Sequence, residues 1–135
     1  MDEQRKLIAL TIWWCEGTKP REDKRWVNSV LYPIEVTNSD FRIIRIFIDF
    51  LTKDLGISIN KLKGQVHLHE DDNIQELETY WSSILNIPIS QFNKTIIKGK
   101  GNKPGKNKGT FKLRLYDKVL YLQLVEMLEK YIAIV

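Results

Sequence analysis

The segment from Leu7 to Lys19, LIALTIWWCEGTK, is the feature that most constrains the fold of this chain. It is almost entirely apolar for nine residues and then changes abruptly to Glu-Gly-Thr-Lys. A membrane-spanning helix needs about 20 apolar residues, so we expect an internal helix or strand here. A helix over residues 5–15 would place Thr11 and Cys15 on one face, four residues apart. These smaller side chains allow a second helix to approach closely, and Gly17 can end the helix with a positive φ.

The composition predicts one globular domain covering residues 1–135. Hydrophobic residues make up 43% of the chain and charged residues 28%, which is ordinary for a globular protein. A single cysteine excludes an internal disulfide framework and suits a reducing compartment. Because Asp2 and Glu3 stand where a signal peptide would be basic, we expect a cytoplasmic protein with no membrane partner.

Positive charge is concentrated in the last third of the chain. The segment from Ser90 to Lys118 contains nine basic residues and one acid, whereas the whole chain has a net charge of only +4. A basic block flanked by predicted strands favours nucleic acid as the partner.

The hydrophobic periodicity predicts an α+β fold with four helices and four strands. We expect helices over residues 5–15, from 39 to about 55, from 72 to 85, and from 117 onward, with Ser39, Asp72 and Asp117 at their N-terminal ends. Strands are expected over residues 34–37, 63–69, 93–98 and 110–116, the last two forming a hairpin around a mobile basic loop, 99–109.

Alternation along these strands predicts a four-stranded, mostly antiparallel sheet with two different faces. One face is apolar and matches the amphipathic helices, whose cores would include Trp13, Trp14 and Trp81. The other face is open, polar and basic, as in α+β platforms that bind nucleic acid. Base edges would be recognised from this face, and lysines of the loop would contact phosphates. The predicted face comprises Glu35, Thr37, Gln65, His67, His69, Lys94, Lys98, Lys112 and Arg114, and the loop lysines are Lys100, Lys103, Lys106 and Lys108.

An apolar helix with small residues along one edge, followed by an acid and a glycine, resembles the signature helix of the LAGLIDADG homing endonucleases. Glu16 and Gly17 fall on the last two letters of that motif, Cys15 on the small residue before the acid, and Thr11 on the first glycine. The segments EVTNSD, HLHEDD and YWSSILNIP and the basic hairpin are similar to small prokaryotic members, so the resemblance spans roughly Leu7 to Leu128. The acid is Glu where the family usually has Asp.

The resemblance implies a homing-endonuclease-like fold and metal-dependent cleavage of double-stranded DNA. Two signature helices would pack side by side in a homodimer, with Thr11 and Cys15 lining the contact, and would act on a pseudo-palindromic target. Glu16 would bind Mg²⁺ or another divalent cation, with the carbonyl of Gly17 as a further ligand. The family also implies a lysine near the catalytic water, and the candidates are Lys98, Lys112 and Lys19, the last also a candidate DNA contact.

Several alternatives remain open at the level of sequence. The same scaffold suits a DNA-binding regulator that does not cleave, or an RNA-splicing maturase. Glu16 can be a plain helix-end carboxylate paired with Lys19, and Cys15 a small core residue. His67 and His69, with nearby acids, suggest zinc, although no further Cys or His cluster accompanies them. The basic loop can also be a solubilising linker.

Overall fold

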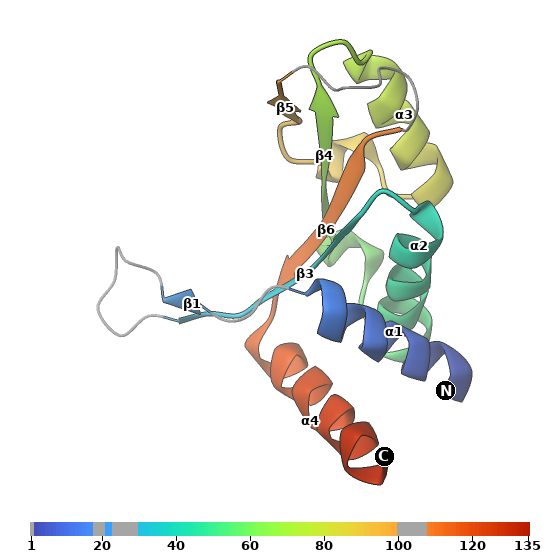
Figure 1. The fold of residues 1–135 in the computed structure, drawn as a ribbon, viewed down its shortest axis with the longest axis vertical. Coiled ribbons are helices and arrows are strands. Elements are labelled where there is room, and N and C mark those ends of the chain that lie inside the picture. Colours follow the sequence, from blue (N-terminus) through green and yellow to red (C-terminus); the bar gives the residue numbers. More distant parts are fainter. Residues whose placement is uncertain (1, 18–20, 23–29, 100–107) are drawn as a thin grey trace.

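The computed structural model describes residues 2–17, 21–22, 30–99 and 108–135, and within them the chain has the expected α+β class (Figure 1). The helices are α1 (Glu3–Glu16), α2 (Phe41–Asp49), α3 (Ile74–Leu85) and α4 (Lys118–Ile134). The strands are β1 (Arg21–Glu22), β2 (Val30–Leu31), β3 (Pro33–Asn38), β4 (Lys63–His69), β5 (Ile96–Lys98) and β6 (Thr110–Tyr116). A π-helical segment, η1 (Phe50–Asp54), continues α2, and the 3-10 turns are η2 (Ile59–Lys61) and η3 (Ile89–Gln91).

Four of the described strands form a mixed sheet in the order β3-β6-β4-β5. The β3–β6 and β6–β4 pairs are antiparallel and the β4–β5 pair is parallel, so the expected mostly antiparallel sheet is confirmed. The expected hairpin of β5 with β6 is wrong, because β6 lies between β3 and β4 and β5 pairs with β4 instead. Seven residues of β6, apolar on one face, bury more surface in the centre of the sheet than the three exposed residues of β5.

The apolar face of the sheet and the helices form one core. Phe111 and Leu113 of β6 and Val66 of β4 are buried on this face because side chains alternate along each strand. Trp81 of α3 stacks on Phe111 with 5.3 Å between ring centroids. Trp13 of α1 is also buried, so both of these tryptophans are core residues, as expected.

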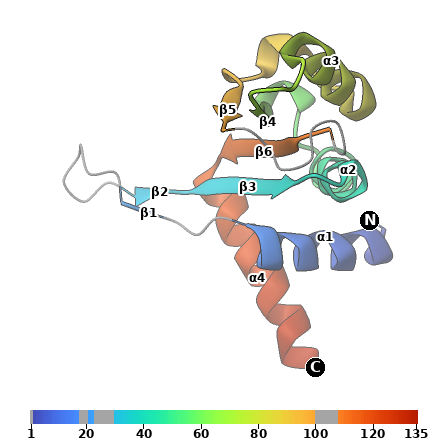
Figure 2. The same ribbon diagram turned by 45° about the horizontal axis from the view of Figure 1, so that its top comes forward.

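The helices α1, α2 and α3 pack beside the sheet, whereas most of α4 extends beyond it, next to α1 (Figure 1). Among the helices, α3 contacts α2, α2 contacts α1, and α1 contacts α4. The β1–β2 pair is a separate ribbon that extends away from the body of the molecule (Figure 2). No helix in the described part of the chain is long and apolar enough to cross a membrane.

Two of the three expected helix starts are displaced by one residue. Asp40, not Ser39, precedes α2, and its side chain accepts a hydrogen bond from the backbone N–H of the second helical residue. Asn73, not Asp72, caps α3. Asp72 instead accepts a 2.8 Å hydrogen bond from a backbone N–H at the end of β4, which leaves it unable to cap the helix. Asp117 caps α4 as expected.

Candidate nucleic-acid interface

The Glu16–Gly17 pair lies where the C-terminal end of α1 meets the edge of the sheet. The N–H of Gly17 donates to the carbonyl of Trp13 at 2.7 Å, and Gly17 forms an antiparallel bridge with Val36 of β3. The expected positive φ of Gly17 is wrong, because its φ of −82° and ψ of 153° are extended. Glycine is required instead by a close approach, since a Cβ would lie 2.3 Å from the Trp13 carbonyl oxygen. The carboxylate-bearing end of α1 is therefore tied to β3.

Glu16 occupies an electrostatically unusual position. A helix carries partial negative charge at its C-terminal end, which disfavours a carboxylate and favours a cation. Glu16 is exposed there, and the last turn of α1 has no basic residue. Its carboxylate has no hydrogen bond or ion pair with a residue in the described ranges. Its alternative partner, Lys19, lies outside those ranges. The end of α1 is thus a locally negative point that a cation would stabilise.

The face of the sheet opposite the helices carries polar side chains in rows, because residues paired across strands point to the same side. One row runs from β3 through β6 to β4 as Glu35, Arg114 and Lys63, and the next as Thr37, Lys112 and Gln65. Beyond these rows, His67 and His69 of β4 pair with Ile96 and Lys98 of β5. We call this set the polar face. It contains all the expected strand residues except Lys94.

Glu35 differs from the other residues of the polar face because its side chain is buried. Its side chain is only 3% exposed, with one oxygen 3.0 Å from Nε of Arg114 and the other 3.8 Å from Nζ of Lys112. A buried carboxylate is stable only when it is paired, and here both cations come from the neighbouring strand β6. Glu35 is therefore the buried member of the polar face, and it lies beneath the side chains of Lys112 and Arg114.

The pKa of His67 is affected by the positive charge of this face. Partial burial lowers the pKa of its imidazole below 6.5, and the charges of Lys98, Lys112 and Arg114 lower it further. Its Nε2 lies 3.4 Å from Oε1 of Gln65. Cations from β5 and β6 therefore act together around the middle of the polar face.

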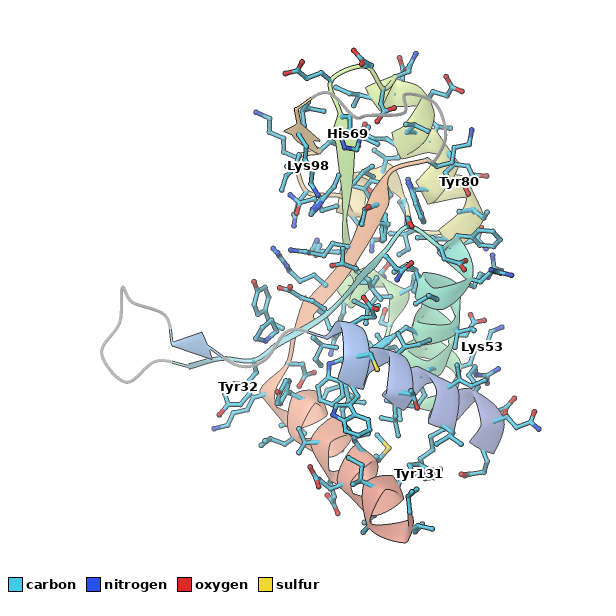
Figure 3. The ribbon with its side chains drawn as sticks, in the orientation of Figure 1. Tyr32, Lys53, His69, Tyr80, Lys98 and Tyr131 are labelled. Carbon is cyan, nitrogen blue, oxygen red and sulfur yellow. The ribbon has the colours of Figure 1, made fainter. Side chains whose placement is uncertain are left out.

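The two candidate catalytic lysines differ in their distance from α1. Lys112 lies on β6, the strand next to β3, and pairs in register with Thr37, which adjoins the residue that Gly17 bridges. Lys98 lies on β5, at the opposite edge of the sheet (Figure 3). Neighbouring strands are about 4.8 Å apart, so three strand spacings put β5 about 14 Å from β3. Within one chain, Lys112 is the better placed of the two.

The other predicted lysine contacts separate into three groups. Lys94 precedes β5, and its carbonyl accepts a 2.9 Å hydrogen bond from the Gln65 amide, so it is not a strand residue of the polar face. Lys108 has its Nζ 5.7 Å from the ring centroid of Tyr80, which lies on α3, away from Lys98 (Figure 3). The remaining predicted contacts, Lys19, Lys100, Lys103 and Lys106, lie outside the described residues, as does most of the expected loop 99–109.

The zinc alternative gains no support from the described residues. His67 and His69 share the polar face, as alternation predicts. The carboxylate of Asp72 lies 3.9 Å from Nδ1 of His69. However, nowhere in the described ranges do three or more His, Cys, Asp or Glu side chains converge as metal ligands do.

The outer face of α1 is apolar and is not covered by the described part of the chain. Thr11 and Cys15 are exposed, so the interpretation of Cys15 as a core residue is wrong. Leu7 and Ile8 are each 48% exposed and Trp14 is 51% exposed, which also contradicts the expected burial of Trp14. A helix that packs only against its own chain needs one apolar face, towards the core, whereas α1 has apolar side chains on a second, exposed face as well.

An apolar groove continues this uncovered face between α1 and α4. Its volume is about 330 Å³. Its lining includes Leu7, Thr11 and Trp14 of α1 and Leu128, Tyr131 and Ile132 of α4. Exposed apolar surface of this kind marks contact sites on many proteins.

Two further residues on this side of the sheet were not predicted. Lys63 is exposed and pairs with Arg114 across β4 and β6. It lies two residues before Gln65, so the alternation of β4 was the signal that would have found it. Tyr116 is 51% exposed, with its ring centroid 6.0 Å from the Arg114 guanidinium carbon, and it also follows the alternation of β6.

No known protein-family model, curated protein or solved structure matches this chain.

Proposed function

We propose that this chain is a site-specific, homodimeric double-stranded DNA endonuclease of the LAGLIDADG type, with Glu16 as a ligand of the divalent metal ion. The observation that carries the proposal is the position of Glu16. It is an exposed carboxylate at the negative end of α1, a helix with an uncovered apolar face, and the helix ends beside a basic polar face. The proposed metal-binding acid, dimer contact and DNA-binding surface would thus be adjacent.

The donor set fits a metal site shared between two chains. Each chain contributes one exposed carboxylate, and the carbonyl of Gly17 is a further oxygen ligand. Mg²⁺ is commonly bound through one or two carboxylates together with water and substrate phosphates. When bound, such an ion would activate water and stabilise the leaving oxygen of a phosphodiester. Glu16 would hold the ion, and Lys112, which pairs with β3 next to the residue that Gly17 bridges, would contact the scissile phosphate.

The polar face suits duplex DNA because it combines fixed and flexible cationic groups. A strand can enter the major groove and present Arg, Lys, Gln and His side chains to base edges. Lys98, Lys112, Arg114, Gln65 and His67 are of these types and lie on three neighbouring strands. Two copies related by a two-fold axis would recognise a pseudo-palindromic target.

The test is cleavage of a plasmid library with a randomised insert in the presence of Mg²⁺. The parent chain should cut a small set of sequences, and Glu16→Gln should reduce cutting by about a hundredfold or more, because loss of a metal ligand removes several kcal/mol of transition-state stabilisation. Binding to the same duplexes, measured by fluorescence anisotropy, should persist. Glu129→Gln removes an exposed carboxylate on α4 and is the matched control, with unchanged cutting.

Each other outcome has a definite meaning. Undiminished cutting by Glu16→Gln contradicts the assigned role of Glu16. A parent that binds specific duplexes without cutting favours the non-cleaving regulator, and one that prefers RNA favours the maturase. A parent that binds neither excludes all three functions.

A further inference from the structure

The buried Glu35 has no evident use for phosphate binding. A face that attracts DNA gains affinity from each cation and loses it with each anion. Glu35 nevertheless places a negative charge directly beneath the polar face, within 3.0 Å of Arg114 and 3.8 Å of Lys112. If Glu35 affected DNA only through its charge, it would weaken binding. Its geometry indicates a different role, the orientation of Arg114.

Arg114 is held from two sides. Its Nε forms a 3.0 Å ion pair with the Glu35 carboxylate on β3, although the Nε–H is not aligned for a hydrogen bond with a described residue. Its guanidinium carbon lies 6.0 Å from the ring centroid of Tyr116, two residues along β6. The side chain is 23% exposed, so the guanidinium is partly enclosed rather than extended into solvent. The ion pair and the ring contact hold the guanidinium from its Nε side and leave its outer edge unused.

The outer edge of Arg114 is available for a ligand. Its two Nη groups have no hydrogen-bond partner in the described part of the chain. Two parallel N–H groups in one plane match the O6 and N7 acceptors of guanine in the major groove, the commonest specific contact of arginine with DNA. Arg114 also lies on β6, an inner strand of the sheet, where base edges rather than the phosphates at the rim would be met.

Lys63 provides a contrast within the same row. It pairs in register with Arg114 but is exposed, and it has no ion pair with a described residue. A flexible ammonium group contacts phosphates at many positions and contributes affinity without sequence preference. The row therefore pairs an oriented guanidinium with an unconstrained lysine.

We infer that Arg114 recognises one guanine in each half of a bound DNA duplex and that Glu35 is a positioning residue, which orients Arg114 for this contact. The inference rests on the proposed function as far as duplex DNA is the ligand, but not on cleavage. It assigns a base and a residue pair that determine specificity.

The experiment is selection of bound duplexes from a randomised library in EDTA, followed by sequencing and by affinity measurements on selected sites. The parent should select a guanine at one position in each half-site. Arg114→Lys keeps the charge and should reduce the preference for that guanine about tenfold or more, with little change in affinity for unrelated duplexes. Glu35→Gln should reduce the same preference at the same position.

Lys63→Gln is the control, and it should weaken binding to all duplexes alike and leave the selected sequence unchanged. The double variant Glu35→Gln/Arg114→Lys should show no further loss of preference beyond Arg114→Lys, because Glu35 acts through Arg114. If the circular dichroism spectrum of Glu35→Gln differs from that of the parent, the variant is misfolded. The guanine preference of Arg114→Lys then decides the test, since this variant leaves Glu35 with a cationic partner.

Two outcomes overturn the inference. One is tighter binding of Glu35→Gln to every duplex with unchanged base preferences, because this is the effect of charge alone. The other is an unchanged sequence preference of Arg114→Lys. In both cases the parent still binds specific DNA, so the proposed function survives. A parent with no affinity for duplex DNA overturns the proposed function and the inference together.

Discussion

His67 illustrates how a single side chain on the polar face depends on its neighbours. In isolation an imidazole titrates near 6.5, and here partial burial and then the charges of Lys98, Lys112 and Arg114 lower its pKa. The positive charge that would attract DNA therefore already acts on a neighbouring imidazole in the free protein. Arg114 and Glu35 also depend on each other, because this cation and anion from adjacent strands form an ion pair.

The stability of the folded chain should fall as the pH is lowered below about 6.5, owing to His67. Its folded-state pKa lies below the unfolded value, so the unfolded chain binds a proton first and gains stability relative to the folded one. The free energy of unfolding should decrease as the pH falls from about 6.5 to the folded-state pKa of His67. Urea denaturation of the parent and of His67→Gln between pH 5 and pH 8 measures it, since the variant should lack this component.

DNA phosphates near Lys98 and Lys112 should raise the pKa of His67, so binding should take up a proton. Affinity should then increase as the pH falls from 7.5 to 6, by at most about tenfold per pH unit for one proton. The His67 Cε1 proton resonance, titrated with and without DNA, checks this. A resonance whose titration is unaffected by a bound duplex would remove His67 from the interface.

The helix α1 shows what an element needs in order to hold a functional group at its end. At its start, Arg5 forms two hydrogen bonds of 2.7 and 2.6 Å with Asp54 of η1, which lower the pKa of the Asp54 carboxyl. At its end, Gly17 bridges Val36. With both ends fixed, the helix presents its outer face and Glu16 in a defined orientation.

The packing of β4 on the core can be tested through Gly64. A Cβ at this position would lie 2.3 Å from the ring of Phe111 and 3.1 Å from that of Phe92. Gly64→Ala should therefore lower the free energy of unfolding by about 1–3 kcal/mol, the usual cost of overpacking. Gly99→Ala, where a Cβ meets nothing within 4 Å, is the control and should change it by less than about 0.5 kcal/mol. Urea denaturation distinguishes the two, and equal effects would contradict the close packing of β4.

At the scale of the whole molecule, a two-fold contact would both cover the exposed face of α1 and complete the proposed metal site. Each chain has the Glu16 carboxylate at this point, and the apolar side chains of α1 and the adjoining groove remain exposed among the described residues. A two-fold contact places the same surface against itself, so a single contact through α1 would both bury this face and bring two Glu16 side chains together.

Charge introduced on the outer face of α1 should dissociate the proposed dimer. Thr11→Glu would place two carboxylates in the contact, and an uncompensated buried charge costs about 3–5 kcal/mol, so the dimer should weaken by about a hundredfold or more. Thr79→Glu, at an exposed threonine of α3, is the matched control. Size-exclusion chromatography with light scattering should detect monomers for Thr11→Glu and dimers for Thr79→Glu.

Cleavage should be lost together with dimerisation, because the metal site would be incomplete. A parent that is monomeric at micromolar concentration, with and without DNA, would contradict the shared site. A Thr11→Glu variant that remains dimeric would place the contact on another surface.

Sequence pattern alone predicted the elements whose burial is strictly periodic. The bounds of β4, Lys63–His69, and of β6, Thr110–Tyr116, agree with the prediction because a half-buried strand alternates at every position. The same alternation predicted most of the polar face. Helix ends were less certain, as at α2 and α3, because adjacent polar residues compete for the capping position.

Tertiary structure alone decided which strands pair and which apolar surfaces are covered. The three residues of β5 have too short a pattern to specify a partner, so their pairing with β4 depends on where the longer β6 lies. The burial of Trp13 and the exposure of Trp14 likewise depend on which other segments pack against α1. Hydrophobicity is a local property of the residue, whereas burial depends on segments that are distant in the sequence and packed against it only in the folded chain.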